Sequence, residues 1–352
     1  MTYLDCAATN PYPQYRCNDY EYHAYFNPNA NYAFGEKKLL HECEERVKKA
    51  IGANGGKVIF GGTASQLVEN LMNCDKGDFW PVGGAYEHDS VDRFLIEHNL
   101  HNIEGLEETL KTFTPTGMKP FVFWQGVNNV TGRIFDVETI GRLCHKYGAF
   151  FVCDMTAMIG HAPIPCNIDE WCSAITYSGH KIGTELGVGA MWIGDEFNSW
   201  LGDFKLHGTP NVAGALAITD ATEDVVKSAP YNELYYYELT KMLKDVLEAN
   251  GIEFDLIGDK QSVASHAHAI NAIRLSGFNA DALQQYLASK QIYVGIGASA
   301  CAEDHDYRVL NAFGLADEEA SEVIRVSFCE DSTIDDVNKL VDGIKEFKGK
   351  YL

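Results

Sequence analysis

The segment from Thr176 to Lys181 reads Thr-Tyr-Ser-Gly-His-Lys and combines residues that can do chemistry together. Asp154 lies a short way upstream, at the end of the apolar run Phe150–Asp154. A lysine amine can form a Schiff base with an aldehyde, and an aspartate can hold a pyridine nitrogen protonated. A serine and a histidine beside the lysine can bond a phosphate and fix the loop. These residue types in this order favour an enzyme that uses pyridoxal 5'-phosphate (PLP).

Length, composition and charge restrict the class of protein. The chain has 352 residues, 46% of them hydrophobic, which is enough for a large core and two domains. Its net charge of −22 argues against a nucleic-acid partner, because phosphates would be repelled. An acidic, soluble surface explains the charge; the alternative is an acidic face that recruits a basic partner. No apolar run reaches the roughly 20 residues of a membrane span, so we expect no membrane association.

The cysteines and the first residues indicate the compartment. Ten cysteines are scattered without a Cys-x-x-Cys pair, so we expect no metal site. The first residues, Met-Thr-Tyr-Leu-Asp, carry no basic and apolar signal-peptide regions. We therefore expect a cytoplasmic protein with reduced thiols.

Strands and helices alternate in the first half of the chain. Val58–Phe60, Phe121–Trp124 and Phe150–Asp154 read as strands, and Val137–Tyr147 has apolar residues at helical spacing. Repeated strand–helix–strand units predict an α/β domain with a mostly parallel sheet. Ligands bind beyond the carboxyl ends of such strands. Asn129, Asp154 and the loop of Lys181 are all expected at such ends.

The pattern changes after Thr209 and predicts a smaller α+β domain. Its expected helices are Tyr231–Ala249, Ala280–Ser289 and Ile334–Phe347, and its expected strands are Ala269–Leu275, Ile292–Ile296 and Val323–Phe328. We place the large domain at residues 13–215, and the small domain at residues 1–12 and 216–352.

Six segments, in order along nearly the whole chain, match motifs of a known family. They are Tyr3–Pro11 (Tyr-Leu-Asp-Cys-Ala-Ala-Thr-Asn-Pro), Glu87–Val91 (Glu-His-Asp-Ser-Val), Val127–Gly132 (Val-Asn-Asn-Val-Thr-Gly), Ser178–Lys181, Gly297–Cys301 (Gly-Ala-Ser-Ala-Cys) and Ile324–Ser327 (Ile-Arg-Val-Ser). The chain resembles the cysteine desulfurases, within class V of the PLP-dependent aminotransferase superfamily. The resemblance implies fold type I, with a mostly parallel seven-stranded sheet and a small domain that carries a catalytic cysteine loop.

The resemblance gives three residues a role in proton and electron movement. Lys181 would bond the cofactor aldehyde, although a surface lysine is the ordinary alternative. Asp154 would hold the ring nitrogen protonated; a helix cap is the alternative. His88 would stack on the ring and handle protons, whereas the following Asp89-Ser90 also fits a plain helix start.

The resemblance also implies a phosphate site. Its expected residues are Ala64, Ser65, Ser178 and His180, because a strand-to-helix junction directs free N–H groups at an anion. Thr209 resembles a phosphate contact supplied by a second subunit, which implies a homodimer. Ordinary caps and turns are the alternative for all of these positions.

The remaining site residues concern the substrate. Asn129 resembles an asparagine near the cofactor's phenolic oxygen, with a turn residue as the alternative. Arg325 resembles the arginine that binds the substrate carboxylate through a bidentate fork, although a lone arginine on a strand is more often a surface charge. Cys301 resembles the nucleophilic cysteine and is set among small residues and followed by polar ones, although most cysteines are buried hydrophobes.

Two departures from the family pattern stand out. Ala157 replaces a glutamine that bonds the cofactor's phenolic oxygen, and an alanine cannot make that bond. The stretch from Cys301 to Arg325 is also shorter than in members with a long mobile loop.

We predict a homodimeric cysteine desulfurase with PLP as its cofactor. It would convert L-cysteine to L-alanine, hold the sulfur as a persulfide on Cys301, and pass it to an acceptor protein, for example in iron–sulfur cluster assembly. One alternative is a related class V enzyme, a selenocysteine lyase or an aminotransferase, in which Cys301 is dispensable. Another is a partner-binding protein that has lost catalysis; intact Lys181, Asp154, His88 and Arg325 argue against it.

Overall fold

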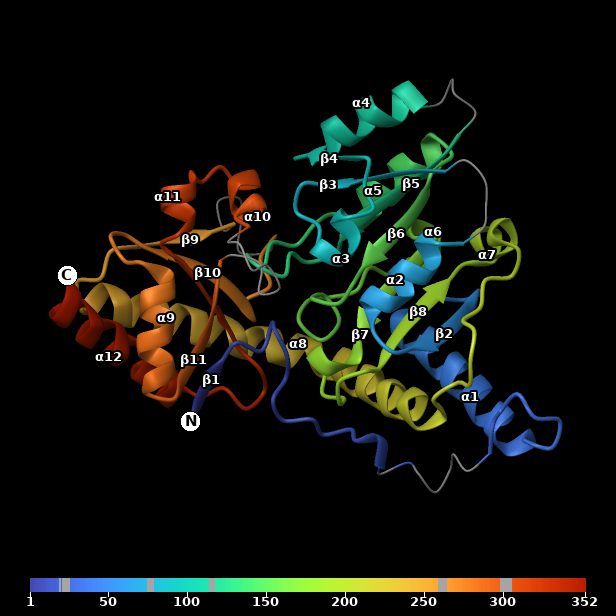
Figure 1. Cartoon of the computed structure of the whole chain (residues 1–352), viewed down its shortest axis with the longest axis horizontal. Coiled ribbons are helices and arrows are strands. Elements are labelled where there is room, and N and C mark those ends of the chain that lie inside the picture. Colours follow the sequence, from blue (N-terminus) through green and yellow to red (C-terminus); the bar gives the residue numbers. More distant parts are fainter. Residues whose placement is uncertain (19, 21–25, 75–78, 114–117, 259–264, 298–305) are drawn as a thin grey trace. The chain divides into compact units, whose positions relative to one another are not determined.

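The structure is a computed structural model that describes residues 1–352 except 19, 21–25, 75–78, 114–117, 259–264 and 298–305 (Figure 1). Within the described ranges, no helix is both long enough and apolar enough to cross a bilayer. The same residues contain no group of histidine, cysteine and carboxylate side chains placed to hold a metal ion.

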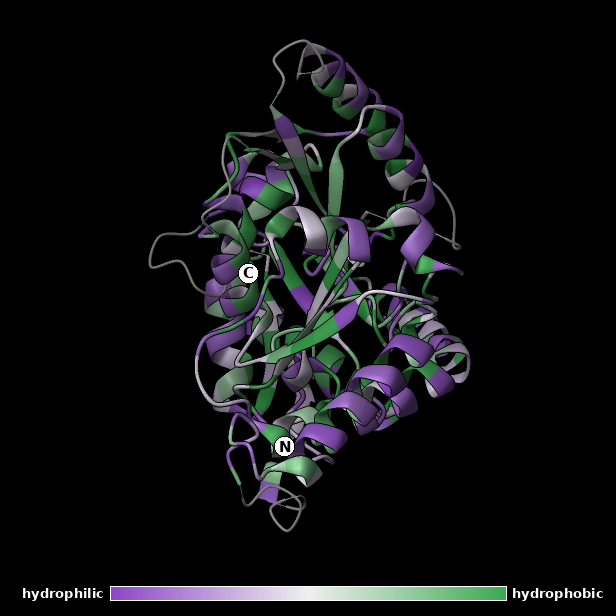
Figure 2. Ribbon diagram, turned by 90° about the vertical axis from the view of Figure 1, so that its right-hand side faces the viewer, coloured by the Kyte–Doolittle hydropathy of each residue, from purple (hydrophilic) through white to green (hydrophobic). Residues whose placement is uncertain are grey.

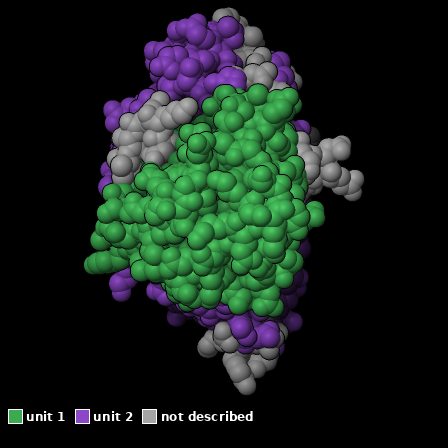
Figure 3. Space-filling model, turned by 90° about the vertical axis from the view of Figure 1, so that its left-hand side faces the viewer, with its two compact units in different colours: residues 1–11, 127–134, 230–352 green, residues 12–126, 135–229 purple. Residues whose placement is uncertain are grey.

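The chain forms two compact units, which Figure 3 colours separately. The large unit comprises Tyr12–Gly126 and Phe135–Ala229, and the small unit comprises Met1–Pro11, Val127–Ile134 and Pro230–Leu352. Contacts thus group residues 216–229 with the large unit. The domain limits expected from the sequence, 13–215 and 1–12 with 216–352, stay a prediction.

Among the residues that the structure describes, the large unit is built on a seven-stranded sheet. In spatial order its strands are β2 (Lys57–Gly61), β8 (Gly189–Ile193), β7 (Ala174–Ser178), β6 (Phe150–Asp154), β5 (Lys119–Gln125), β3 (Phe79–Gly84) and β4 (Glu97–Leu100). The neighbours from β7 to β4 pair in parallel, and β8 pairs antiparallel with both β7 and β2. The prediction of a mostly parallel, seven-stranded sheet is confirmed.

Helices connect these strands. They are α1 (Phe34–Ile51), α2 (Ala64–Met72), α3 (Asp89–Asp92), α4 (Ile103–Phe113), α5 (Val137–Lys146), α6 (Ile168–Trp171), the one-turn 3-10 helix η3 (Gly179–Lys181) and α7 (Asp195–Leu201). The centre of the sheet is covered on both faces, as a parallel sheet requires. Phe150–Cys153 of β6 are accordingly all buried, and Leu67 and Leu71 of α2 join a core cluster with Phe121 and Phe123. Figure 2 shows the hydrophobic strands and the more hydrophilic helices around them.

The small unit has a five-stranded sheet within the described ranges. Its order is β1 (Thr2–Leu4), β11 (Ile292–Ile296), β12 (Val323–Ser327), β10 (Ile270–Leu275) and β9 (Phe254–Ile257). The β1–β11 pair is parallel and the other pairs are antiparallel. Its helices are α9 (Ala280–Ser289), α10 (Arg308–Ala312), α11 (Asp317–Ala320) and α12 (Ile334–Tyr351). The prediction that the second part of the fold is of the α+β class is therefore confirmed.

One helix begins earlier in the structure than the sequence predicts. The predicted helix Tyr231–Ala249 is the second part of α8, which runs from Val212 to Ala249 and contains Pro230 in its interior. Proline lacks a backbone N–H and usually ends a helix, so Pro230 reads as a boundary in the sequence. In the structure the helix continues through Pro230, and the boundary between the two units lies at this residue.

Candidate active site

Asp154 and Lys181 lie at the ends of neighbouring strands of the large sheet. Asp154 is the last residue of β6 and pairs in register with Thr176 of β7. Lys181 ends η3, which directly follows β7. The parallel arrangement of β6 and β7 places both residues at one edge of the sheet, where ligands bind in α/β folds. The structure therefore brings the two residues that carry the predicted chemistry to the same edge.

The carboxylate of Asp154 is fixed by its own turn. Asp154 is half-buried, and its Oδ1 accepts a hydrogen bond of 2.9 Å from the N–H of Thr156. The Met155 N–H donates to the Thr176 carbonyl at 2.9 Å, which keeps the chain close to β7 beyond the strand end. Hydrogen-bonded turns rather than a regular helix follow Asp154, and its carboxylate caps the first of them.

Two threonine hydroxyls beside Asp154 are buried without a hydrogen-bond partner among the described residues. They are Thr156 Oγ1, two residues after Asp154, and Thr176 Oγ1, opposite Asp154 in the β6–β7 register. An unsatisfied buried hydroxyl costs about 1–3 kcal/mol, so such groups usually have a partner. Ala157, in place of the family glutamine, is also buried here and contributes no polar atom. This edge therefore has polar atoms that a polar ligand would satisfy.

Two imidazoles lie within range of the Lys181 charge. Burial first, and then the charges of Lys181 and His88, lower the pKa of His180 to about 4. Burial and the charge of Lys181 lower the pKa of His161 to about 4 as well. Both imidazoles are therefore neutral at pH 7, and each has one nitrogen that can donate a hydrogen bond and one that can accept a hydrogen bond. His161 was not singled out from the sequence, because it lies in an irregular segment, residues 155–162, whose path no local pattern predicts.

His88 has the structural role that was its alternative explanation. It is the N-cap of α3, and its Nδ1 accepts a hydrogen bond of 3.1 Å from the Ser90 N–H. This bond engages Nδ1 and fixes the orientation of the ring. Capping does not conflict with catalysis, since a ring held by one nitrogen can still present a face and its other nitrogen.

The expected phosphate residues converge on the start of α2. Thr63 caps this helix by accepting from the Gln66 N–H at 3.0 Å, and the Ala64 N–H donates to Ser178 Oγ at 3.1 Å. A Cβ at Gly189 would lie 2.8 Å from the Thr63 carbonyl carbon, so a glycine lets β8 pass this close to the junction. The N-terminus of a helix attracts anions through its free N–H groups and its dipole.

Ser65 and His180 lie next to this contact in the chain, and both are half-buried. The structure therefore brings Ala64, Ser65 and Ser178 together at one helix start, and His180 is the second residue after Ser178. Thr63, which caps the same helix, is not among the site residues predicted from the sequence. The pattern Gly-Gly-Thr-Ala-Ser after a short strand was the available signal, since threonine is a common N-cap.

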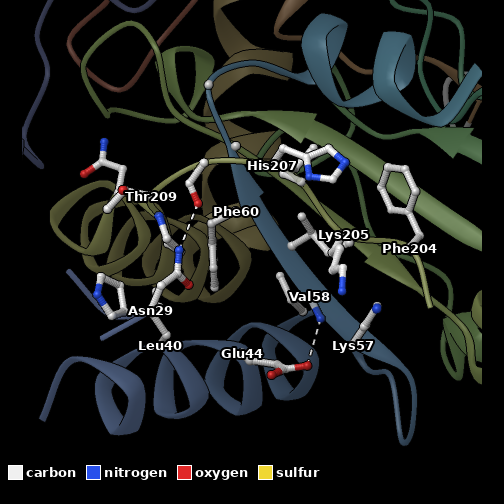
Figure 4. Close-up of a pocket in the computed structure, with 18 of the residues that line it drawn as sticks. Asn29, Leu40, Glu44, Lys57, Val58, Phe60, Phe204, Lys205, His207 and Thr209 are labelled. Carbon is white, nitrogen blue, oxygen red and sulfur yellow. Dashed lines mark hydrogen bonds between the residues drawn. The ribbon is translucent and has the colours of Figure 1, made fainter. Parts of the chain in front are cut away.

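Thr209 is exposed on the rim of a groove in the large unit (Figure 4). The groove has a volume of about 850 Å³, and Gly61 and Gly62, which precede α2, also line it. Asn29 Nδ2 donates to the Gly208 carbonyl at 3.1 Å and thereby holds the loop before Thr209. The apolar lining residues include Leu40, Val58, Phe60, Phe204 and Leu206, and the basic ones are Lys37, His41, Lys57, Lys205 and His207.

Arg325 and Asn129 meet in the small unit. Arg325 lies on β12 and is 6% exposed, and its Nη1 donates to the Asn129 carbonyl oxygen at 3.1 Å. Its Nη2 donates to Asp5 Oδ1 at 2.7 Å. The adjacent Asn128 makes the turn, because its Oδ1 accepts from the backbone of Val130 and Thr131. Cys301, with residues 298–305, lies outside the described residues.

The comparisons with known proteins fit this geometry. A family model described as aminotransferase class-V matches residues 102–340. The chain belongs to this family. Its relatives include the cysteine desulfurase IscS of Edwardsiella ictaluri, 24% identical with 99% of this chain and 93% of the relative covered. A putative cysteine desulfurase IscS 1 of Bacillus subtilis is 25% identical, with 95% of each chain covered. The family resemblance seen in the motifs is thus confirmed.

Solved structures confirm the fold. A NifS-like protein from Rickettsia africae has a TM-score of 0.79 at 21% identity, with 99% of both chains covered. The apo structure of a cysteine desulfurase from Thermococcus onnurineus has a TM-score of 0.76 at 21% identity, with 99% of this chain and 94% of the other covered. Fold type I, as predicted from the motifs, is therefore the fold of this chain.

Proposed function

We propose that this chain is a cysteine desulfurase that uses PLP. The observation that carries the proposal is the placement of Asp154 and Lys181 on neighbouring strand ends, in a chain whose curated relatives over nearly its full length are named cysteine desulfurases. The reaction takes sulfur from L-cysteine, releases L-alanine and leaves the sulfur on Cys301 as a persulfide.

The residues at the sheet edge fit PLP. Thr156 Oγ1 and Thr176 Oγ1 are buried polar atoms for which the described residues offer no partner, as expected beside a polar group bound in the finished enzyme. The start of α2, with Ser178 bonded to Ala64, suits a phosphate dianion. Asp154 would hold the pyridine nitrogen protonated, and Lys181 would bond the aldehyde carbon. When bound, PLP would withdraw electrons from the substrate's α-carbon.

The chain's own groups supply the rest of the reaction. Lys181 Nζ takes the proton from the α-carbon, and His88 assists further proton transfers. Arg325 binds the substrate carboxylate through its guanidinium N–H groups. The Cys301 thiolate attacks the substrate sulfur, so a sulfur–sulfur bond forms as the carbon–sulfur bond breaks. Protonation of the substrate carbons then gives L-alanine, and the persulfide keeps the sulfur for transfer.

We also propose a homodimer whose second copy occupies the groove beside Thr209. The groove is lined by apolar side chains, three lysines and one carboxylate, Glu44, and one of the lysines, Lys57, pairs with Asp203 at 2.6 Å. Because the lysines outnumber the carboxylate on a chain of net charge −22, an acidic surface of a second copy complements the groove. Thr209 and the glycines before α2 line the same groove, which suits a phosphate contact that crosses between subunits. A sulfur-acceptor protein, a cytoplasmic location and a role in iron–sulfur cluster assembly complete the proposal.

Cys301→Ala tests the desulfurase reaction against the lyase alternative. Wild type incubated with L-cysteine, PLP and a reductant should form alanine and sulfide in equal amounts, and brief exposure without reductant should add one sulfur to the peptide that contains Cys301. The variant should keep the cofactor's visible absorbance but lose turnover by at least about 10³-fold, because the attacking thiolate is absent. Light scattering of the same preparations tests the dimer.

Cys166→Ala is the matched control, because Cys166 is an exposed cysteine elsewhere in the chain and should be dispensable. If Cys301→Ala releases alanine at the wild-type rate, the persulfide mechanism is wrong. A lyase that needs no thiol, such as one acting on selenocysteine, then replaces it.

A further inference from the structure

A carboxylate from the start of the chain pairs with the buried Arg325 across the small sheet. Asp5 Oδ1 accepts a hydrogen bond of 2.7 Å from Arg325 Nη2. The Asp5 side chain is 21% exposed and that of Arg325 is 7% exposed, so most of this ion pair is removed from water. A charge that is this buried needs a partner, and removing one member leaves the other uncompensated.

The sheet register explains how the two residues meet. Leu4 of β1 pairs with Val294 of β11, and Gly295 of β11 pairs with Arg325 of β12. Asp5 directly follows Leu4 of β1, and β11 lies between β1 and β12 in the sheet. The Asp5 carboxylate therefore reaches Arg325 across Gly295 of β11. A Cβ at Gly295 would lie 2.7 Å from Asp5 Oδ1 and 3.0 Å from Arg325 Nε. The glycine leaves the space through which the ion pair forms.

The guanidinium is held at two different nitrogens. Asp5 binds Nη2 and the Asn129 carbonyl oxygen binds Nη1 at 3.1 Å, so the plane of the group is defined before any ligand arrives. Nε is buried and has no hydrogen-bond partner within the described part of the chain. A guanidinium has five N–H donors, so the two bonds leave donors for a carboxylate. Holding a flexible side chain in place beforehand lowers the entropy lost on binding.

We propose that Asp5 is a positioning residue that orients Arg325 for the carboxylate of the amino-acid substrate. The proposal rests on the function proposed above, in which Arg325 binds that carboxylate. Asp5 acts through Arg325 and takes no part in the chemistry at the substrate's sulfur. Replacing Asp5 should therefore weaken the binding of amino acids that have a free carboxylate. It should leave their turnover rate, and the binding of analogues that lack the carboxylate, nearly unchanged.

The test compares Asp5→Ala, Asp5→Asn and Asp5→Glu in the PLP-loaded enzyme. Asp5→Ala should raise KM for L-cysteine about tenfold, which corresponds to about 1.4 kcal/mol, and change kcat by less than about threefold. Asp5→Glu, which keeps the charge, should recover most of the lost affinity. Asp5→Asn keeps an oxygen acceptor for Arg325 and covers the case in which Asp5→Ala does not fold; its KM should be intermediate.

A ligand pair separates positioning from general damage to the fold. The cofactor absorbance is titrated with L-alanine and with L-alaninamide, which lacks the carboxylate. Asp5→Ala should weaken L-alanine binding about tenfold and alter L-alaninamide binding by less than about twofold. Glu322→Ala is the matched control, since it removes a carboxylate from another ion pair of this sheet, with Arg274 Nε at 2.7 Å, and should change neither ligand.

Equal weakening of both ligands in the Asp5 variants, or an unchanged KM, would overturn the positioning role. A lower KM in Asp5→Ala would also overturn it, because Asp5 would then compete with the substrate for Arg325. If wild type forms no alanine from L-cysteine, the desulfurase function fails, and the titrations with L-alanine and L-alaninamide still decide the role of Asp5.

Discussion

Beside Asp154 in the large unit, Thr156 Oγ1 and Thr176 Oγ1 are buried with no hydrogen-bond partner among the described residues, whereas in the small unit the buried Arg325 has its charge paired with Asp5. In the first region, these two hydroxyls could find a hydrogen-bond partner in a bound molecule. The second already pairs the charge of Arg325 from within the chain, although Arg325 Nε is also buried without a hydrogen-bond partner among the described residues. The two regions thus solve the problem of buried polarity in different ways.

This difference indicates what each region needs from its ligand. The edge at Asp154 and Lys181 gains hydrogen bonds when a polar cofactor binds, so binding and stability should be linked there. The Asp5–Arg325 pair is formed beforehand, so under the proposed mechanism a substrate carboxylate would meet an arginine that is already oriented. Variants in the first region should therefore affect the cofactor, and variants in the second should affect substrate affinity.

Lys181→Ala should have the largest effect. Under the proposed mechanism, this variant would lack both the amine that bonds the cofactor aldehyde and the group that takes the α-proton. We expect turnover to fall by at least about 10⁴-fold and the visible absorbance to disappear after dialysis. Lys339→Ala, at a lysine 53% exposed on α12, should keep both properties. A Lys181 variant that retains the absorbance would mean that another amine holds the cofactor.

Asp154→Asn should have the next largest effect. The amide keeps an oxygen that can accept from the Thr156 N–H, but it carries no charge to hold a pyridine nitrogen protonated. We expect the cofactor to remain bound while turnover falls about 10²- to 10³-fold. The measurement is turnover together with exchange of the α-hydrogen of L-alanine in heavy water. Wild-type exchange in this variant would remove Asp154 from the proposed role.

The sequence was sufficient for the parts of the site that depend on strand ends. Asp154 ends one apolar strand and Lys181 lies just beyond another, and parallel strands have their carboxyl ends at one edge of the sheet, so the proximity of the two residues could be predicted. The contact of Ala64 with Ser178 joins two segments that the motifs had already assigned to one phosphate site. In both cases a local pattern and one general rule of α/β folds were enough.

Other features depend on packing between distant segments. His161 lies near Lys181 because of the path of an irregular segment, and Asp5 reaches Arg325 because the register places Gly295 between them. The continuation of α8 through Pro230 likewise contradicts the local preference of proline. Such features follow from the tertiary structure, which outweighs local propensity.

Thr176→Val should have the smallest effect and tests the contrast between the two regions most directly. Valine keeps the volume of threonine but removes the hydroxyl, which has no hydrogen-bond partner within the described ranges. The cofactor-free variant should be as stable as wild type or more stable by up to about 1 kcal/mol, whereas cofactor affinity should fall severalfold.

Thr219→Val is the control, because the buried Thr219 Oγ1 donates to the Ala215 carbonyl at 2.6 Å, and losing that bond should cost about 1 kcal/mol. Thermal unfolding with and without PLP measures both. Equal destabilisation of the two cofactor-free variants would show that Thr176 already has a partner, and the contrast between the two regions would then be wrong.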